Sequence, residues 1–413
     1  MALLWRMTVP FSLVDRRGDV RKLLFMPGES ISHALVRNGV PPTSVIVQRD
    51  GSTVVGDDEI IDTSSAYEAR LIEGYDIAGI LERMRIGAPD GCSYLHRRLR
   101  VAVTGALRME ERHLQTEDVV GLVESTVRDT LDRFGLVSPG QRLVLGLSGG
   151  VDSSSLLMLL DAARRHGRGG KSVSFDLVAA TFEDFDSRDS ETFGSAQSLA
   201  RQCGIEHRVL ESGMAEKVFN LKRPVAQILM LLMETDDAHQ AMYVDHHTTR
   251  RVLEVFADSV DSSTITLGLH TTDLLAGLLN ATTSGLDMGG VPGRDVGPYR
   301  YVFPMAFVPK RELHLYYMAK TGRPPKQTVP NQWEFNPTDR NFYYYLADLL
   351  QWHWPGIEAW MFTGHSRRCR GQQPLFETCG NCGASVRTQP LAGAQRGLCD
   401  VCALLDRYGW LSS

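Results

Sequence analysis

Residues 143–154 read LVLGLSGGVDSS, an apolar run that leads into two glycines and then into acidic and hydroxyl side chains. The run Leu143–Leu147 is typical of a short buried strand, and residues 154–165 carry the apolar spacing of a helix. Two adjacent glycines let the backbone turn sharply and approach an anion closely. The amides that follow, at the start of the helix, point hydrogen-bond donors at that anion. This stretch therefore predicts a phosphate-binding loop between a strand and a helix.

The residues of this loop restrict the phosphate chemistry that it can support. Asp152 is unusual, because a carboxylate beside a triphosphate is repulsive unless Mg²⁺ lies between them. No lysine stands where a Walker-type loop requires one, which argues against transfer of the terminal phosphoryl group. An ordinary turn before a capped helix is the alternative, but the position between strand and helix favours phosphate. The residues expected to hold it are Ser148, Gly149, Gly150, Asp152, Ser153 and Ser154.

Helix and strand patterns alternate from residue 118 onward. The expected strands cover residues 142–147, 175–181, 207–210 and 264–268. The expected helices cover residues 120–134, 154–165, 191–203, 246–258 and 272–284. Such alternation predicts a parallel, doubly wound sheet, in which a ligand lies beyond the carboxyl ends of the strands.

The heptad at residues 148–154 resembles the loop of the PP-loop ATP pyrophosphatases, the adenine nucleotide α-hydrolase superfamily. Members of this superfamily hold the pyrophosphate part of ATP in the loop while AMP is transferred to a carbonyl or carboxylate oxygen. The resemblance implies that ATP also contacts the end of the second strand and a later motif, at Thr181, Phe182, Gly268 and His270.

The later motif departs from the family pattern. Leu269 stands where the family has a histidine, and Thr272 where it has an acidic residue. His270 and Asp273 are therefore either polar contacts of the nucleotide or caps of the following helix. We assign catalytic roles to Asp152, His246 and Asp273.

Four of the seven cysteines form two C-x-x-C pairs near the C-terminus, with sixteen residues between the inner members. Two C-x-x-C pairs at this separation favour a metal site with four thiolate ligands in tetrahedral arrangement over disulfides. Four protein ligands leave no open coordination position, so we expect a structural Zn²⁺ ion. The ligands are Cys379, Cys382, Cys399 and Cys402.

The pattern C-x-x-C-G … C-x-x-C-A-L-L-D resembles the zinc finger of the tRNA 2-thiouridine synthetases, a PP-loop branch, and Arg250-Arg251 resembles its paired arginines. This resemblance covers about residues 118–408 and implies sulfur transfer. In that branch a C-x-x-C pair before the arginines binds a catalytic iron–sulfur cluster or carries persulfide. Tyr243 and His246 stand there instead, so we do not expect a cluster. Adjacent helical residues point about 100° apart, and we expect His246, not His247, to face the site.

The first 75 residues follow the order strand–strand–helix–strand–strand, with strands expected at residues 8–14, 20–25, 45–47 and 69–72 and a helix at 30–38. This order resembles the β-grasp fold of ubiquitin-like sulfur carriers. Those carriers end in a free Gly-Gly, whereas residues 73–76 read EGYD in mid-chain, so a docking or substrate-positioning role is favoured.

These patterns together predict an α/β protein whose doubly wound, parallel-sheet PP-loop core is flanked by two smaller units. We expect a β-grasp unit at residues 1–78, a basic helical connector at 79–117, the PP-loop domain at 118–365 and a zinc ribbon at 366–413.

The net charge of −5 gives the whole chain no electrostatic bias towards nucleic acid. No apolar stretch has membrane-spanning length, and the first apolar run is too short for a signal peptide. We therefore expect a cytoplasmic protein without a membrane partner.

Three functions fit the sequence. The first is an ATP-dependent sulfurtransferase that adenylates an oxygen and displaces AMP with sulfur from an external carrier protein. The second is an adenylating synthetase that uses an amine or another nucleophile. The third is a degenerate subunit that binds nucleotide or tRNA for a partner. The expected acceptor is tRNA or a small molecule, and a homodimer is compatible with all three.

Overall fold

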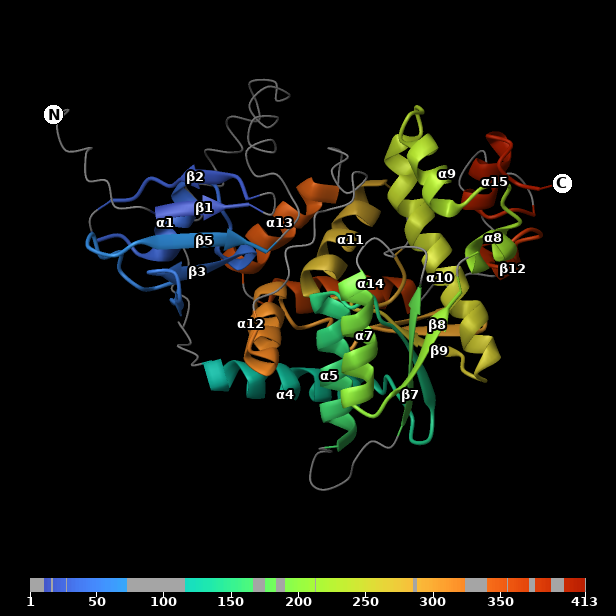
Figure 1. Cartoon of the computed structure of the whole chain (residues 1–413), viewed down its shortest axis with the longest axis horizontal. Helices are drawn as coiled ribbons and strands as arrows, with labels where there is room; N and C mark the ends of the chain where they lie inside the picture. The colour runs from blue at the N-terminus through green and yellow to red at the C-terminus, as the bar shows by residue number, and fades with distance from the viewer. Residues whose placement is uncertain are drawn as a thin grey trace.

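The computed structural model describes residues 11–15, 18–26, 28–72, 116–165, 175–182, 190–211, 213–284, 288–323, 340–354, 356–370, 376–387 and 397–412. Figure 1 shows three parts along the long axis: an N-terminal sheet, a central layered core and a C-terminal cysteine-bearing segment. The connector predicted at residues 79–117 lies almost entirely outside the described residues.

The central sheet has the strand order β10-β11-β9-β6-β7-β8. Its neighbours pair in parallel except for β10 and β11, which are antiparallel. The strands are β6 (Arg142–Gly146), β7 (Asp176–Phe182), β8 (Glu206–Leu210), β9 (Thr264–Thr266), β10 (Gly293–Val296) and β11 (Tyr299–Val302). The predicted strands are thus found within one or two residues, and the parallel sheet is confirmed.

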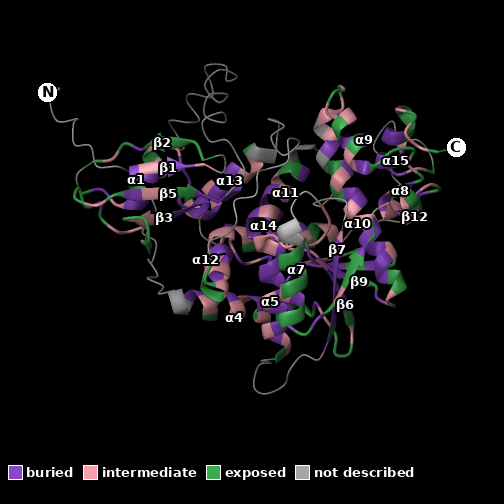
Figure 2. Cartoon of the chain, in the orientation of Figure 1, coloured by how far each residue is buried: buried purple, intermediate pink, exposed green. Residues whose placement is uncertain are grey.

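Both faces of this sheet are buried. Alternate residues of β6 enter different cores, with Val144 in one cluster and Leu143 and Leu145 in the other, as the period of two in a strand requires. Figure 2 shows buried residues on both sides of the central strands. This two-sided burial is typical of a doubly wound sheet.

Helices supply the two covering layers. The face that contains Leu143 packs against α4 (Thr116–Phe134), α5 (Val151–Arg165), α7 (Ser190–Gln202) and α12 (Lys310–Thr321). The face that contains Val144 packs against α8 (Met214–Phe219), α9 (Val225–Leu232), α10 (Ala241–Ser259), α11 (Thr271–Ser284), α13 (Arg340–His353), α14 (Ile357–Arg370) and α15 (Asp400–Arg407). The short 3₁₀ turn η3 (Ala238–Gln240) leads into α10.

The N-terminal sheet has the order β2-β1-β5-β3-β4, with β1 and β5 parallel and the other pairs antiparallel. It comprises β1 (Phe11–Val14), β2 (Val20–Lys22), β3 (Val45–Arg49), β4 (Thr53–Val54) and β5 (Tyr67–Leu71), with helix α1 (Ile31–Arg37) and the 3₁₀ turn η1 (Pro42–Ser44). Its core also includes Tyr345 of α13, so the sheet rests on that helix (Figure 1).

The C-terminal segment pairs β12 (Phe376–Thr378) with β13 (Ser385–Arg387) and ends in α15. Its buried cysteines belong to the same apolar cluster as α10. Within the described part of the chain, none of the helices combines the length and apolar character that crossing a membrane requires.

Candidate active site and four-cysteine site

The phosphate loop predicted at residues 148–154 follows β6 and opens α5. Gly149 has φ of +83°, a conformation that side chains rarely adopt. The Ser153 hydroxyl accepts a hydrogen bond from the Ser148 amide at 3.2 Å, and the two hydroxyl oxygens lie 3.0 Å apart. Ser153 and Ser154 are buried, whereas Ser148 is exposed. The loop is therefore shaped from within by Ser153, and its outward surface is Ser148, Gly149 and Gly150.

Gly268 lies directly against this loop. A Cβ atom at this position would be 2.8 Å from the Ser153 amide nitrogen and 3.0 Å from the Asp152 carbonyl carbon. Only glycine allows the chain after β9 to approach the start of α5 this closely. The structure thus brings Gly268 to the predicted site, and gives it a packing role that the sequence alone did not indicate.

His270 and Asp273 cap α11 and also face the loop. The His270 amide donates to Asp273 Oδ2 at 3.2 Å, and the Asp273 amide donates to His270 Nδ1 at 3.4 Å. Because Nδ1 accepts a hydrogen bond, Nε2 is the ring nitrogen that carries a proton. That atom lies 3.3 Å from Asp273 Oδ2 and 3.9 Å from Asp152 Oδ1. The capping role of His270 and Asp273 is observed, and their contact with the nucleotide stays a prediction.

The Asp152–His270 contact is incomplete. Asp152 Oδ1 and His270 Nε2 are both buried without a hydrogen-bond partner among the described residues. A separation of 3.9 Å is too long for a hydrogen bond, and catalytic hydrogen bonds are often long before a ligand binds. The pair therefore presents two buried polar atoms side by side that lack hydrogen-bond partners among the described residues.

Thr181 and Phe182 end β7 beside the loop. The Thr181 hydroxyl donates to the Leu147 carbonyl at 2.5 Å and lies 2.8 Å from His207 Nε2. Burial lowers the pKa of His207 from its usual 6.5. Sequence analysis missed His207, because only the pairing of β7 with β8 brings it here. The adenine contacts assigned to Thr181 and Phe182 stay predictions.

The four cysteines predicted as ligands gather at one buried site. Their sulfur atoms all lie within 4.8 Å of one another. Cys399 caps α15 and donates its amide to Cys379 Sγ at 3.3 Å. Hydrogen bonds from the neighbouring cysteines, first Cys382, lower the pKa of the Cys379 thiol. A set of four buried sulfur donors suits a soft metal centre.

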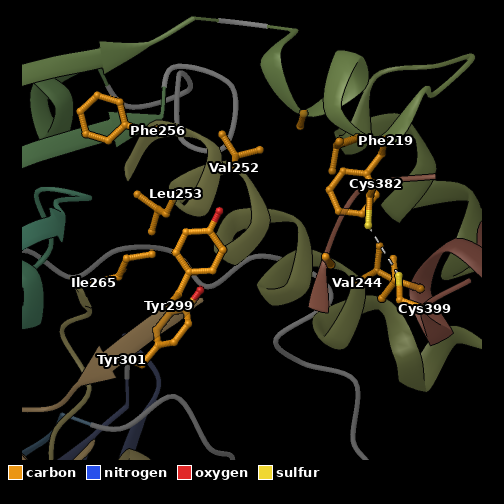
Figure 3. Packing of buried hydrophobic residues seen from close by; sticks show 14 of the residues in the cluster. Phe219, Val244, Val252, Leu253, Phe256, Ile265, Tyr299, Tyr301, Cys382 and Cys399 are labelled. Carbon is orange, nitrogen blue, oxygen red and sulfur yellow. Dashed lines mark hydrogen bonds between the residues drawn. The ribbon is translucent and has the colours of Figure 1, made fainter. Parts of the chain in front are cut away.

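Helix α10 contacts this site through Arg251 and His247. Arg251 Nε donates to the Cys382 carbonyl at 2.7 Å, and His247 Nε2 lies 3.5 Å from Cys399 Sγ. Figure 3 shows Phe219 and Val244 packed beside Cys382 and Cys399. The cysteines are thus fixed to the core by backbone and side-chain contacts.

The structure corrects one expectation about α10. His247 is the buried member of the histidine pair, and His246 is exposed. Burial, with the positive charge of Arg250, lowers the pKa of His247 to about 3 and keeps the ring neutral. The helix turns position 247 towards the cysteines together with Val244, so it is His247, not His246, that points inward. The catalytic role assigned to His246 stays a prediction that this placement does not favour.

Comparisons with known proteins support the PP-loop identification. Residues 140–257 match a family model described as Asparagine synthase. The tRNA-cytidine(32) 2-sulfurtransferase of Neisseria gonorrhoeae is 22% identical over 213 residues, 51% of this chain and 61% of that protein. The Klebsiella pneumoniae protein of the same name is 23% identical over 197 residues, 47% of this chain and 57% of its own. The chain therefore spans about three fifths of the curated relatives that it matches.

A solved structure shares the fold. It is the U34-tRNA thiolase NcsA from Methanococcus maripaludis with its [4Fe-4S] cluster, with a TM-score of 0.52 and 16% identity over 73% of this chain and 92% of the other. Together with the family match, this confirms the identification of a PP-loop core resembling the tRNA thiolation branch. The comparisons do not confirm the β-grasp assignment of the N-terminal sheet.

The expectation of structural Zn²⁺, with no iron–sulfur cluster, is contradicted. The neighbour that shares the fold carries a [4Fe-4S] cluster, and this chain has a buried four-cysteine site. The two findings point to an iron–sulfur cluster instead of zinc. Cysteine spacing misled the prediction because tetrahedral sulfur donor sets are used by zinc and by iron–sulfur centres alike.

Proposed function

We propose that this protein is an ATP-dependent sulfurtransferase that acts on tRNA. It would adenylate a carbonyl oxygen of a base with release of pyrophosphate, and sulfur would then displace AMP. The observation that carries the proposal is the loop at residues 148–154 at the carboxyl end of β6, with the Asp152–His270 pair beside it. Ligands of doubly wound sheets bind at this edge.

Different residues of the loop would have different roles in binding ATP. The Gly149 amide would donate to the β- and γ-phosphates, in the manner of anion sites at helix N-termini. The Ser148 and Gly150 amides already donate within the loop, to the Ser153 and Ser148 hydroxyls. Ser153 keeps the loop in shape through its contact with Ser148. The end of β7, at Thr181 and Phe182, lies alongside and would contact the adenine.

Asp152, His270 and Asp273 would act at the α-phosphate. The Nε2–H group of His270 can donate to Asp152 or to a phosphate oxygen that enters between them. Such a preformed donor stabilises negative charge that develops during attack on phosphorus. The Asp273 amide donates to the other ring nitrogen, Nδ1, at 3.4 Å, and the Asp273 carboxylate lies 3.3 Å from Nε2.

The four-cysteine site would hold an iron–sulfur cluster. Cysteine thiolates are the usual ligands of such clusters, and all four cysteines are buried here. A cluster held by four cysteines has no iron left open to substrate, so its role would be structural. It would stabilise the C-terminal segment where that segment contacts α10. The displacing sulfur would then come from outside the chain, from a sulfur-carrier protein.

The N-terminal sheet would be a β-grasp, ubiquitin-like unit within residues 1–78. Its strand order, with parallel β1 and β5 at the centre, supports this assignment. The proposed boundaries of the other units are residues 79–117, 118–365 and 366–413.

A second function is favoured by the cysteine positions. The chain has no cysteine between Cys203 and Cys369, and the matched family model is described as Asparagine synthase. An amine, in place of sulfur, would then displace AMP from the adenylate.

One experiment separates these functions. The full chain is incubated with ATP, bulk tRNA and a sulfide source, and AMP, pyrophosphate and digested nucleosides are measured by mass spectrometry. We expect AMP, pyrophosphate and a thiolated nucleoside. In Asp152→Asn, loss of the carboxylate should slow pyrophosphate release by about 100-fold. Asp176→Asn is the control, because that carboxylate is 71% exposed at the start of β7. Release of AMP and pyrophosphate without thiolation would favour the amine reaction. Absence of both AMP and pyrophosphate would refute adenylation.

A further inference from the structure

Tyr344 of α13 reaches the nucleotide site from a distant part of the sequence. Its hydroxyl donates to Asp273 Oδ1 at 2.5 Å. The other carboxylate oxygen of Asp273 accepts from the His270 amide and faces His270 Nε2 at 3.3 Å. His270 in turn faces Asp152 of the phosphate loop at 3.9 Å. A series of polar groups therefore runs from α13 to His270, and a gap of 3.9 Å separates His270 from Asp152 of the loop.

The next residue on the same helix belongs to the N-terminal sheet. Tyr345 is buried in the core of that sheet, and its hydroxyl donates to the Gly39 carbonyl at 3.2 Å. The Thr43 hydroxyl donates to the Asp348 carbonyl of α13 at 2.9 Å. Adjacent helical residues diverge by about 100°, so Tyr344 and Tyr345 serve different neighbours. Figure 1 shows α13 between the N-terminal sheet and α11.

A second contact fixes this arrangement from α12. Arg311 donates to the Pro42 carbonyl at 3.1 Å and to Asp57 Oδ1 at 2.8 Å, and its side chain is only 19% exposed. The N-terminal sheet is thus attached to two helices of the core by buried and partly buried polar contacts. Such contacts fix the orientation of the sheet on the helices, because a buried polar group left without its partner destabilises the folded protein.

The position of Asp273 matters because the Asp152–His270 contact is unfinished. His270 is fully buried, and its Nε2 has no hydrogen-bond partner among the described residues. A histidine that must donate across a short gap needs a fixed ring. Asp273 contacts this ring through its amide, which donates to Nδ1 at 3.4 Å, and through its carboxylate, which lies 3.3 Å from Nε2. We therefore expect the ring to keep its place only while the Asp273 carboxylate is held. A charge-assisted hydrogen bond of the Tyr344 type is among the stronger ones in proteins.

We propose that Tyr344 is a positioning residue for the adenylation site, and that the N-terminal sheet acts as the support that keeps α13, and therefore Tyr344, in place. The proposal rests on the proposed function, since it requires ATP at the loop. In this role the N-terminal sheet supports the reaction by holding α13. The role requires neither a free C-terminal glycine nor sulfur bound to the sheet.

The test uses Tyr344→Phe in the full chain, with pyrophosphate release in the presence of ATP and bulk tRNA, and with equilibrium binding of ATP measured separately. We expect kcat to fall about tenfold, while the Kd for ATP changes less than about twofold, because the loop amides are untouched. Tyr317→Phe on α12 is the matched control, since its hydroxyl makes no hydrogen bond within the described residues.

A second variant tests the support. Thr43→Val combined with Tyr345→Phe removes two hydrogen bonds between the N-terminal sheet and α13. We expect the same pattern, a lower kcat with ATP affinity retained, and circular dichroism that matches the wild type.

The outcomes separate this proposal from the proposed function. If the wild type binds no ATP and releases no pyrophosphate, the proposed function fails and takes this proposal with it. If the wild type is active and Tyr344→Phe keeps its kcat, the positioning role alone is refuted. It is refuted equally if kcat and ATP affinity fall together in proportion to the loss of folded protein, because that pattern marks a merely structural residue.

Discussion

Replacing Gly268 by alanine places a single methyl group against the phosphate loop. The nearest atoms would be the Ser153 amide nitrogen at 2.8 Å, the Asp152 carbonyl carbon at 3.0 Å and the Ser153 Cα at 3.1 Å. All three are backbone atoms at the start of α5, so no side-chain rotation can relieve the contact. Gly268 is not among the glycines with positive φ, so the backbone conformation itself accepts alanine, and the effect is purely steric.

The size of the effect follows from the overlap. A comfortable carbon contact begins near about 3.5 Å, so the loop and the chain after β9 must separate by roughly 0.7 Å. Overpacking of this kind costs about 1–3 kcal/mol, which lowers Tm by several degrees in a chain of this size. Misplacement by about 1 Å near the chemistry can cost roughly 100-fold in rate. We expect kcat/KM for ATP to fall by about 10- to 100-fold.

The assay is pyrophosphate release with ATP and bulk tRNA, together with thermal unfolding. Gly194→Ala on α7 is the control, because a Cβ there meets nothing within 4 Å and alanine is favourable in an exposed helix. A Gly268→Ala protein with wild-type kcat/KM and a wild-type affinity for ATP would show that this close approach does not shape a nucleotide site.

Three further predictions concern other parts of the molecule. Cys399→Ser removes one of the four sulfur ligands and should abolish the iron and labile sulfide that we expect in anaerobically purified wild-type protein; a wild type without iron would contradict the cluster. His207 has a pKa lowered below 6.5 by burial, so the unfolded chain binds a proton first as the pH falls, and stability should be lost below about pH 6.5. Urea unfolding at pH 7.5 and 5.5 should show a smaller loss in His207→Gln, and an equal loss would exclude this histidine as the source. Arg311→Met leaves Asp57 without its partner at a contact that is only partly exposed and should lower the free energy of unfolding by about 1–3 kcal/mol. Arg49→Met, at a more exposed pair, should cost less, and equal losses would show that the Arg311 contact is no stronger than a surface pair.

The sheet was predictable because its strands are short apolar runs bounded by turn residues. Arg142–Gly146 and Thr264–Thr266 were found within two residues of the expected bounds. The start of α10 was missed by five residues, since Ala241 and Val244 are buried but carry no cap signal between them. Periodicity locates an apolar face well and locates a helix end poorly when no capping residue marks it.

The sequence indicated only those candidate-site residues that follow an expected strand. Ser148, Asp152 and the pair His270 and Asp273 lie at strand ends that a parallel sheet brings to one edge. Tyr344 lies 71 residues from its partner Asp273, and nothing in its local sequence distinguishes it from the tyrosines beside it. Contacts of this kind depend on how α13 packs against α11, which single-sequence patterns do not encode.

The paired arginines show how one buried group can account for a motif. Glu254 is fully buried on α10, and both Arg250 and Arg251 pair with it, at 3.4 Å and 3.1 Å. Tyr301 of β11 donates a third contact at 2.6 Å. A buried carboxylate costs several kcal/mol unless it is compensated, and Arg250, Arg251 and Tyr301 together compensate Glu254. Because Arg251 also holds the Cys382 carbonyl, the same compensation ties the four-cysteine site to the sheet. The burial of the Glu254 carboxylate therefore explains the paired arginines without a contact to tRNA.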